Sequence, residues 1–281
     1  MKESSDLIRS TVERLRPALG DMALPVAERL LEHVLTCSRS ELYLMRAMPD
    51  VEQLREIDRI VKRCVSHEPL DYILGSAYFF NREFMVAPSV LLPRPDTEVL
   101  VEEVLSGERA EELLFADIGT GSGCIAGILT DERPGWRGIG IDRSFAALTI
   151  ARRNCAQERV ALVCSDMLSA VAPASRFDLI VSNPPYIPSE TVQTLDTSVR
   201  DFEPHSALDG GPDGLDFYRK LAAGAPAFLK PGGRLYCEIG FDQEEAVRKL
   251  FSKNPWKEFR CRRDLAGHPR VIRCGLRKEY Q

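Results

Sequence analysis

Between residues 113 and 182 the chain repeats short apolar segments that alternate with stretches able to form helices. Each apolar segment has a polar residue at or near its end. Three such segments, 113–118, 137–142 and 160–166, carry an aspartate there, and a fourth, 177–182, is followed by Asn183. Alternating strands and helices favour a parallel sheet with helices on its faces. The sequence therefore predicts an α/β domain whose polar side chains gather at the carboxyl edge of the sheet, where such sheets bind ligands.

The tetrapeptide Asn183-Pro184-Pro185-Tyr186 is the most informative motif. Neither proline has an N–H, and the first restricts Asn183 to extended backbone, so the strand must end in a stiff corner. A side-chain amide, two carbonyls and an aromatic ring stand at this corner. They can accept both hydrogens of a substrate –NH2 group and cover its plane. The alternative is a proline turn with an incidental asparagine and tyrosine, and the tetrapeptide alone does not separate the two.

A glycine-rich loop follows the first strand, and the apolar residues 124–129 after it can begin a helix. Glycines allow the backbone to approach a bound nucleotide closely. Asp117 precedes the loop, and its carboxylate would repel a pyrophosphate but suits a cationic ligand with an ammonium group, such as S-adenosylmethionine. The predicted cofactor loop consists of Gly119, Thr120, Gly121, Ser122 and Gly123.

Two further acids end the next strands. Asp142 is placed where a ribose diol is held by hydrogen bonds, and Asp166 where the exocyclic amine of an adenine would lie. Each aspartate alone is more often a helix cap or a turn residue. Three acid-tipped strands followed by Asn183 favour a cofactor site instead.

Together these residues resemble the class I S-adenosylmethionine-dependent methyltransferases, a Rossmann-like α/β fold, and the NPPY motif resembles the branch that methylates planar –NH2 groups. Longer strings resemble the HemK/PrmC family, from about Tyr72 to Arg273. They are YILG at 72–75, FMVAPSVLLPRPDTE at 84–98, ALDGGPDGLDFY at 207–218 and DLAGHPRVI at 264–272. The family often has an aromatic residue where this chain has Met167, whose thioether can still pack on an adenine.

The resemblance implies methylation of the side-chain N5 of the glutamine in the GGQ loop of peptide chain release factors. S-adenosyl-L-methionine would be the cofactor, and a release factor the protein partner. Asn183 and Pro184 would accept the two amide hydrogens, and Pro185 and Tyr186 would complete the substrate site. The alternatives are a glutamine methyltransferase for a ribosomal protein, a DNA or RNA amino-methyltransferase, and a module that binds without turnover. A dinucleotide oxidoreductase is disfavoured by Asp117 and by the GxGxG spacing.

Composition narrows these alternatives. The 281 residues are 44% hydrophobic with a formal net charge of −5, and a sequence-independent nucleic-acid binder normally carries a basic stripe instead. The sequence contains no histidine pair with metal-ligand spacing and no apolar run of about 18 residues that would span a membrane. We expect a cytoplasmic monomer without metal, membrane or direct nucleic-acid contact.

Periodicity predicts three regions. Residues 1–72 form a helical bundle for substrate docking, with a capping box at Asp50 and Gln53. Residues 73–95 form a β-hairpin linker, and residues 96–281 the methyltransferase domain. Within the last region we expect Asp96 or Thr97 to cap a helix, 230–233 to form a turn, and the long stretch 187–216 to act as a lid.

Overall fold

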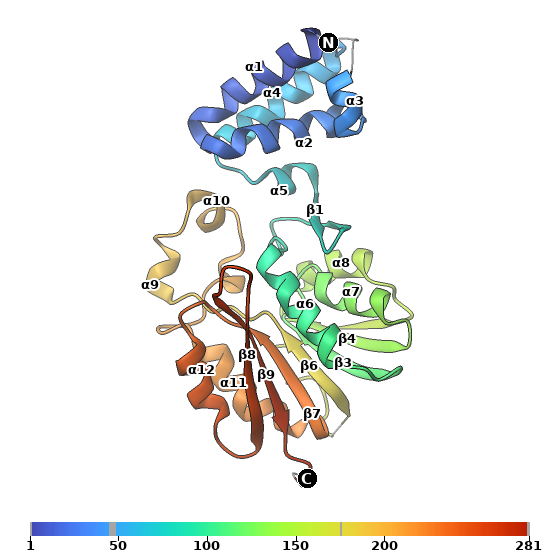
Figure 1. Ribbon diagram of the computed structural model, residues 1–281, viewed down its shortest axis with the longest axis vertical. Helices are drawn as coiled ribbons and strands as arrows, with labels where there is room; N and C mark the ends of the chain where they lie inside the picture. The colour runs from blue at the N-terminus through green and yellow to red at the C-terminus, as the bar shows by residue number, and fades with distance from the viewer. Residues whose placement is uncertain (1, 45–48, 175, 280–281) are drawn as a thin grey trace. The chain divides into compact units, whose positions relative to one another are not determined.

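The computed structural model describes residues 2–44, 49–174 and 176–279. The chain divides into two compact units (Figure 1). The first comprises the residues up to Gly75 together with 196–202, and the second comprises Ser76–Leu195 and the residues from Glu203 onward. None of the helices in these described ranges is long and apolar enough to cross a membrane.

The first unit is helical. Apolar residues at helical spacing face one another in its core, where Leu15, Leu30 and Leu42 are fully buried. Asp50 and Gln53 form the predicted capping box at the start of α4, and Gly75 ends α5 in the left-handed conformation. The helices are α1 (Lys2–Leu19), η1 (Gly20–Met22), α2 (Ala23–Leu35), α3 (Arg39–Leu44), α4 (Val51–Val65), α5 (Leu70–Leu74) and α10 (Thr197–Arg200).

The second unit opens with the predicted hairpin, made of β1 (Ser76–Phe79) and β2 (Arg82–Met85). The hairpin is shorter than the expected linker, because residues 86–94 leave the two-stranded sheet and belong to no strand. Helix α6 (Pro95–Gly107) follows. The expectation that Asp96 or Thr97 caps this helix is wrong: Arg94 is the N-cap, with Pro95 in the first turn.

A seven-stranded sheet forms the centre of the second unit, in the order β5-β4-β3-β6-β7-β9-β8. All neighbours are parallel except β9, which is antiparallel to both β7 and β8. From β3 the chain builds outward through β4 and β5 and then returns to place β6 on the other side, so β3 and β6 flank the switch point. The strands are β3 (Leu113–Ile118), β4 (Trp136–Asp142), β5 (Val160–Cys164), β6 (Phe177–Ser182), β7 (Leu229–Glu238), β8 (Trp256–Arg263) and β9 (Pro269–Leu276).

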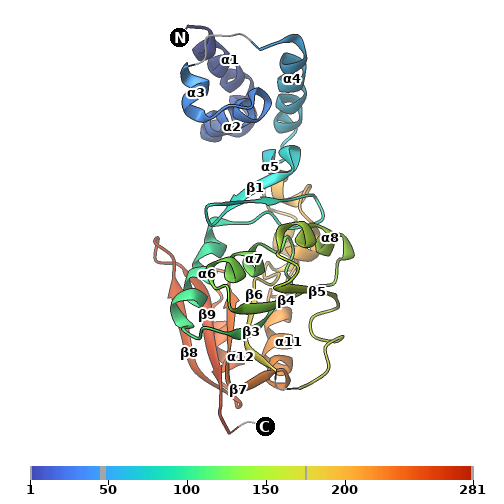
Figure 2. The ribbon, with the colours of Figure 1, turned by 90° about the vertical axis from the view of Figure 1, so that its right-hand side faces the viewer.

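Helices cover both faces of this sheet (Figure 2). Strand residues alternate between the faces: Leu179 and Val181 pack with α6 and α7, whereas Ile180 packs with α11 and α12. The remaining helices are α7 (Cys124–Glu132), α8 (Phe145–Asn154), α9 (Ser189–Val192), η2 (His205–Ala207), α11 (Asp216–Gly224), η3 (Ala225–Ala227) and α12 (Glu244–Phe251).

Strand β7 differs from the prediction of a turn at 230–233. The strand runs through these residues, but Phe177 pairs with Leu229 and Leu179 pairs with Arg234. Residues 230–233 are therefore an irregular insertion in the ladder rather than a turn before the strand. Gly232, with a φ of 80°, allows the backbone to bulge there.

Candidate active site

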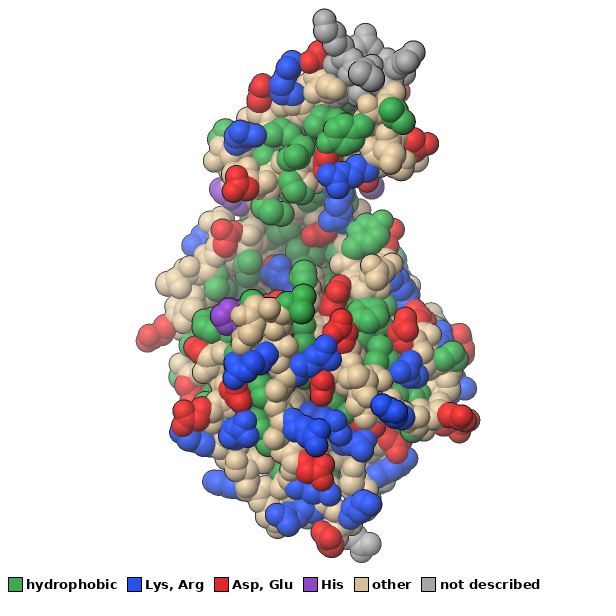
Figure 3. Space-filling model, in the orientation of Figure 1, with side chains coloured by type: hydrophobic (Ala, Val, Ile, Leu, Met, Phe, Trp, Pro, Cys, Tyr) green, Lys and Arg blue, Asp and Glu red, His purple; other side chains and the backbone are tan. Residues whose placement is uncertain are grey.

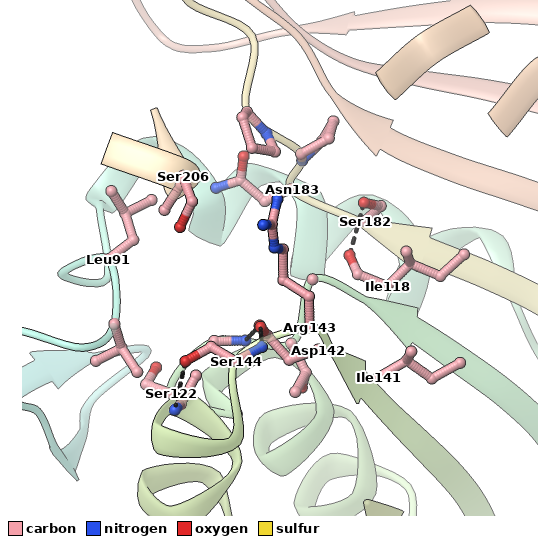
Figure 4. Close-up of a pocket in the computed structure, with 18 of the residues that line it drawn as sticks. Leu91, Ile118, Ser122, Ile141, Asp142, Arg143, Ser144, Ser182, Asn183 and Ser206 are labelled. Atoms are coloured by element: carbon pink, nitrogen blue, oxygen red, sulfur yellow. Dashed lines mark hydrogen bonds between the residues drawn. The ribbon is translucent and has the colours of Figure 1, made fainter. Parts of the chain in front are cut away.

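A pocket opens at the carboxyl ends of β3, β4 and β6, and all residues that line it belong to the second unit (Figure 4). The turns after β3 and β6 meet closely: Ser182 Oγ donates to the Ile118 carbonyl at 2.7 Å, and a Cβ on Gly119 would lie 3.9 Å from the Asn183 carbonyl oxygen. The pocket therefore occupies the switch point of the sheet, as predicted for an open α/β sheet.

The glycine loop forms one wall. Gly119, Gly121 and Gly123 have φ values of 74°, 54° and 78°, which side-chain-bearing residues rarely adopt. The N–H groups of Gly119 and Thr120 both donate to the Ile141 carbonyl, at 2.8 and 3.0 Å, which ties the loop to the end of β4. Gly119, Thr120, Gly121 and Ser122 line the pocket, whereas Gly123 turns inward to begin α7 and does not.

Asp142 holds two loops together at the end of the pocket opposite Asn183 (Figure 4). Its Oδ2 accepts the Gly121 N–H at 3.0 Å, and its Oδ1 accepts the Ser144 N–H at 2.8 Å. Ser144 in turn caps α8, because its Oγ accepts the Ala147 N–H. Each carboxylate oxygen can accept a further hydrogen bond, so Asp142 retains capacity for a ligand's hydroxyl groups.

Asp117 lies behind the wall rather than on it. The side chain is fully buried, and its Oδ2 accepts the hydroxyl of Thr120, which does line the pocket. Burial raises the pKa of Asp117 to about 7, and the Thr120 hydrogen bond opposes that rise. Asp117 thus supports the glycine loop through Thr120, and its expected contact with an ammonium group stays a prediction.

The corner after β6 places Asn183, Pro184 and Pro185 on the pocket. Asn183 Nδ2 donates to the hydroxyl of Thr97 on α6 at 3.0 Å, whereas no described residue donates to Asn183 Oδ1. The amide is therefore oriented with its nitrogen toward the protein and its oxygen available as an acceptor.

Tyr186 does not line this pocket. Its hydroxyl lies 3.4 Å from Glu238 Oε1, and its carbonyl accepts the side-chain amide of Gln243 at 2.9 Å. Burial beside Glu238 raises the pKa of the Tyr186 phenol. Its expected packing on a substrate amide stays a prediction.

The glycines of the 207–218 string support the corner from behind. A Cβ on Gly210 would lie 2.8 Å from Tyr186 Cα, and one on Gly214, whose φ is 73°, would lie 2.3 Å from the Tyr186 carbonyl oxygen. Only glycine allows such close packing of two backbones. The sequence pattern did not reveal this role, because nothing local to 210–214 indicates contact with residue 186.

The turn after β5 contributes Asp166 and Met167, which both line the pocket, and their expected contacts with an adenine stay a prediction. Met167 adopts a left-handed φ of 51°, uncommon for a non-glycine residue. Sequence reasoning missed several lining residues: Leu91, Leu92, Arg143, Ser206 and Phe217. The strings at 84–98 and 207–218 carry only a family resemblance in the sequence. The first contributes Leu91 and Leu92 to the pocket and the second contributes Phe217, while Ser206 directly precedes the second string.

The expected lid, 187–216, is ordered by its own backbone bonds, such as Gly210 N–H to the Ile187 carbonyl at 2.8 Å. Its residues 196–202 group with the helical unit, whereas Pro204, Ser206 and Ala207 line the pocket. Closure over a substrate stays a prediction.

A parallel sheet with one antiparallel strand, a glycine loop after β3 and an acid at the end of β4 define a class I S-adenosylmethionine-dependent methyltransferase. The chain matches the families described as PrmC N-terminal domain, over residues 6–75, and Methyltransferase small domain, over residues 95–200. It belongs to the release factor glutamine methyltransferase family. It is 43% identical over 272 residues to a release factor glutamine methyltransferase of Geobacter sulfurreducens, covering 94% of this chain and 95% of the relative.

A second relative of the same description, from Koribacter versatilis, is 41% identical over 251 residues, covering 88% of this chain and 89% of the relative. A solved methyltransferase structure from Pyrococcus furiosus superposes with a TM-score of 0.52 at 18% identity, covering 79% of this chain and 98% of that one. This last likeness shows the fold alone. The fold and family predicted from the motifs are confirmed.

Proposed function

We propose that this protein transfers a methyl group from S-adenosylmethionine to the side-chain amide nitrogen of the glutamine in the GGQ loop of a peptide chain release factor. The observation that carries the proposal is the orientation of Asn183, whose Nδ2 is engaged by Thr97 and whose Oδ1 is left as an acceptor at the pocket. The names of the relatives support the substrate class.

The residues present fit the cofactor. Asp142 has acceptor capacity for ribose hydroxyls, and Asp166 for an exocyclic amine, while Ile141 and Met167 supply apolar surface for an adenine. The left-handed glycines allow close approach of the backbone. When bound, S-adenosylmethionine supplies a methyl group on a positively charged sulfur.

A carboxamide nitrogen is a poor nucleophile, because its lone pair is delocalised into the carbonyl. Asn183 Oδ1 and the Pro184 carbonyl accept the two hydrogens of the substrate amide and so orient the nitrogen. The same two acceptors stabilise the positive charge that develops on that nitrogen. No side chain of the pocket is required to act as a base, since the proton can leave to water afterwards.

In the predicted domain organisation, the helical unit of residues 1–72 docks the release factor. Residues 73–95 are the linker, and residues 96–281 are the catalytic domain. Exposed apolar side chains support docking: Met22, Leu44 and Val51 are 60%, 70% and 65% exposed. A glutamine on a loop offers few contacts, so selectivity must come from other surface. The alternative is that these helices only shield apolar surface.

The protein acts as a cytoplasmic monomer without direct nucleic-acid contact. Basic and acidic side chains are interspersed on the face of the second unit in Figure 3. Several arginines of the second unit pair with acids, such as Arg263 with Glu244 at 2.8 Å and Arg262 with Glu102. Paired arginines do not make the free basic stripe that phosphate binding needs.

Incubation with methyl-labelled S-adenosylmethionine and, separately, a purified release factor, a ribosomal protein fraction and DNA tests the proposal. We expect label in the release factor only. Label in the ribosomal fraction or in DNA, with none in the release factor, overturns it.

A further inference from the structure

The string at 264–272 resembles the HemK/PrmC family, yet none of its residues lines the pocket. It contains the turn between β8 and β9 and the first residues of β9. Because β9 runs antiparallel to β7, this turn stands at the same edge of the sheet as the carboxyl end of β7 (Figure 1). The mechanism above leaves the turn without a role.

Leu265 projects from this turn into solvent and is fully exposed. The Gly267 N–H donates to the Asp264 carbonyl at 3.0 Å, which makes Leu265 the second residue of a tight turn. The Asp264 carboxylate also accepts the N–H groups of Ala266 and His268, both at 2.9 Å. The turn is therefore held from within, while its leucine buries no apolar surface that would stabilise the fold.

A second exposed apolar side chain stands on the neighbouring turn. Phe241 is 60% exposed and is the second residue of the turn after β7, where the Gln243 N–H donates to the Gly240 carbonyl at 3.0 Å. The rings of Phe241 and His268 meet edge to face, with centroids 5.9 Å apart. A single exposed apolar residue needs no explanation, but two on adjacent turns form a patch. We call Phe241, Leu265 and His268 the edge patch.

The edge patch is tied to the NPPY corner. Gln243, which is buried, closes the turn after β7 and also donates from Nε2 to the Tyr186 carbonyl at 2.9 Å. Beside the other turn, Arg270 pairs with Asp264 at 2.8 Å and with Asp96, at the start of α6, at 3.1 Å. The two turns are therefore fixed relative to the corner and to α6.

Sheet geometry sets how far the edge patch lies from the pocket. Cys237 pairs with Ser182, and Val271 pairs with Glu238, so the strands run from the corner outward in the order β6, β7, β9. Neighbouring strands are ~4.8 Å apart, which places the two turns about 5 and 10 Å along the edge from the corner at Asn183. Three residues of extended chain span about 10 Å, so the segment next to an inserted glutamine can reach the edge patch.

The charges beside the edge patch favour a protein partner over a nucleic acid. Arg263 donates to the Gly267 carbonyl at 2.9 Å and pairs with Glu244 at 2.8 Å, so its charge is used within the second unit. Arg270 is likewise paired with two acids. Apolar side chains beside paired charges are typical of the core and rim of a protein–protein interface, whereas phosphate binding needs unpaired basic groups.

We propose that the edge patch is a docking surface for the release factor, and that it receives an apolar side chain next to the loop that carries the glutamine. The inference rests on the proposed methylation of that glutamine. It assigns a partner contact to the catalytic domain, in addition to the contact expected of the helical unit. Because both turns are fixed before binding, little conformational entropy is lost when the partner covers them.

The test compares Leu265→Ser, Phe241→Ser and Leu265→Met in the full-length protein. Leu265→Met keeps an apolar tip of similar volume. A matched control is Tyr78→Ser: Tyr78 is 65% exposed on β1, outside both the edge patch and the pocket. The assays are kcat and KM for release factor methylation, the Kd of S-adenosylmethionine by calorimetry, and the melting temperature.

We expect Leu265→Ser and Phe241→Ser each to raise KM for the release factor by about 5- to 30-fold, as removal of a central apolar contact from an interface does. The kcat and the Kd of S-adenosylmethionine should stay within about twofold, because neither residue lines the pocket. Leu265→Met and Tyr78→Ser should behave as the wild type. The melting temperature should not change in Leu265→Ser, since a fully exposed side chain contributes little to the fold.

An unchanged KM in both serine variants would overturn the inference. A wild-type dimer in sedimentation that Leu265→Ser dissociates would also overturn it, because a second copy of this chain would then cover the edge patch. A wild-type enzyme that binds S-adenosylmethionine but does not methylate the release factor would refute the proposed function, and this docking surface with it. The failures are distinguishable, because the first two leave methylation by the wild type intact.

Discussion

Replacing Asp142 by alanine should weaken S-adenosylmethionine binding. In the free protein this carboxylate accepts the N–H groups of Gly121 and Ser144, at 3.0 and 2.8 Å, so it fixes the glycine loop and the start of α8 together. The bound cofactor would donate further hydrogen bonds to this charged acceptor. Their removal in Asp142→Ala should cost roughly 1.5–3 kcal/mol of binding free energy. That corresponds to about a 10- to 150-fold increase in Kd. Isothermal titration calorimetry measures it directly.

A matched control separates cofactor binding from fold. Asp178 also accepts a backbone N–H, that of Leu114 at 2.8 Å. It lies near the start of β6, at the amino ends of the strands and away from the pocket. Asp178→Ala should leave the Kd of S-adenosylmethionine unchanged. Asp142→Asn keeps one acceptor oxygen and should fall between wild type and Asp142→Ala. An unchanged Kd in a folded Asp142→Ala variant would refute the reasoning and remove Asp142 from the site.

The other predictions address the substrate side and the fold. Asn183→Ala should bind S-adenosylmethionine nearly normally but methylate at least ~100-fold more slowly, and near-normal turnover would show that NPPY is only a turn. Gly214→Ala, at a φ of 73° with its Cβ 2.3 Å from the Tyr186 carbonyl oxygen, should displace the NPPY corner and reduce both kcat and the melting temperature. A variant with wild-type values would refute that packing role. Deletion of the residues before Gly75 should spare cofactor binding and raise KM for the release factor strongly, whereas unchanged efficiency would contradict docking. In the folded protein, burial raises the pKa of Glu238 to about 7. Between about pH 4.5 and 7 the native state therefore binds more protons than the unfolded chain, so the stability of the wild-type protein should fall as the pH rises through this range. Glu238→Gln should therefore have a melting temperature that falls less over this range, and parallel curves by calorimetry would contradict the assignment.

Local sequence pattern predicted most of the sheet and the pocket wall formed by the ends of β3 and β4. Strand 113–118, its glycine loop and Asp142 are contiguous in sequence or lie at the ends of neighbouring strands, so alternation alone brings them together. The predicted capping box at Asp50 is also a local feature, and it is confirmed.

The rest depends on contacts between distant parts of the chain. Thr97 reads as a helix cap, yet its hydroxyl is used by Asn183, 86 residues later in the chain. The sequence pattern suggests that Asp117 lines the pocket, but its side chain is fully buried. It reaches the pocket only through the hydrogen bond that it accepts from the Thr120 hydroxyl. Pocket wall residues such as Leu91 and Ser206 come from segments without secondary-structure periodicity, so only the fold reveals them.

The most direct test of the central claim is to locate the methyl group. The purified protein is incubated with S-adenosylmethionine and an unmodified release factor, and the digested product is sequenced by tandem mass spectrometry. The account predicts one added methyl group on the side-chain amide of the GGQ glutamine, and at least ~100-fold slower modification of that glutamine when Asn183→Ala replaces the wild type. A methyl group on any other residue, or equal modification by the Asn183→Ala variant, would contradict it.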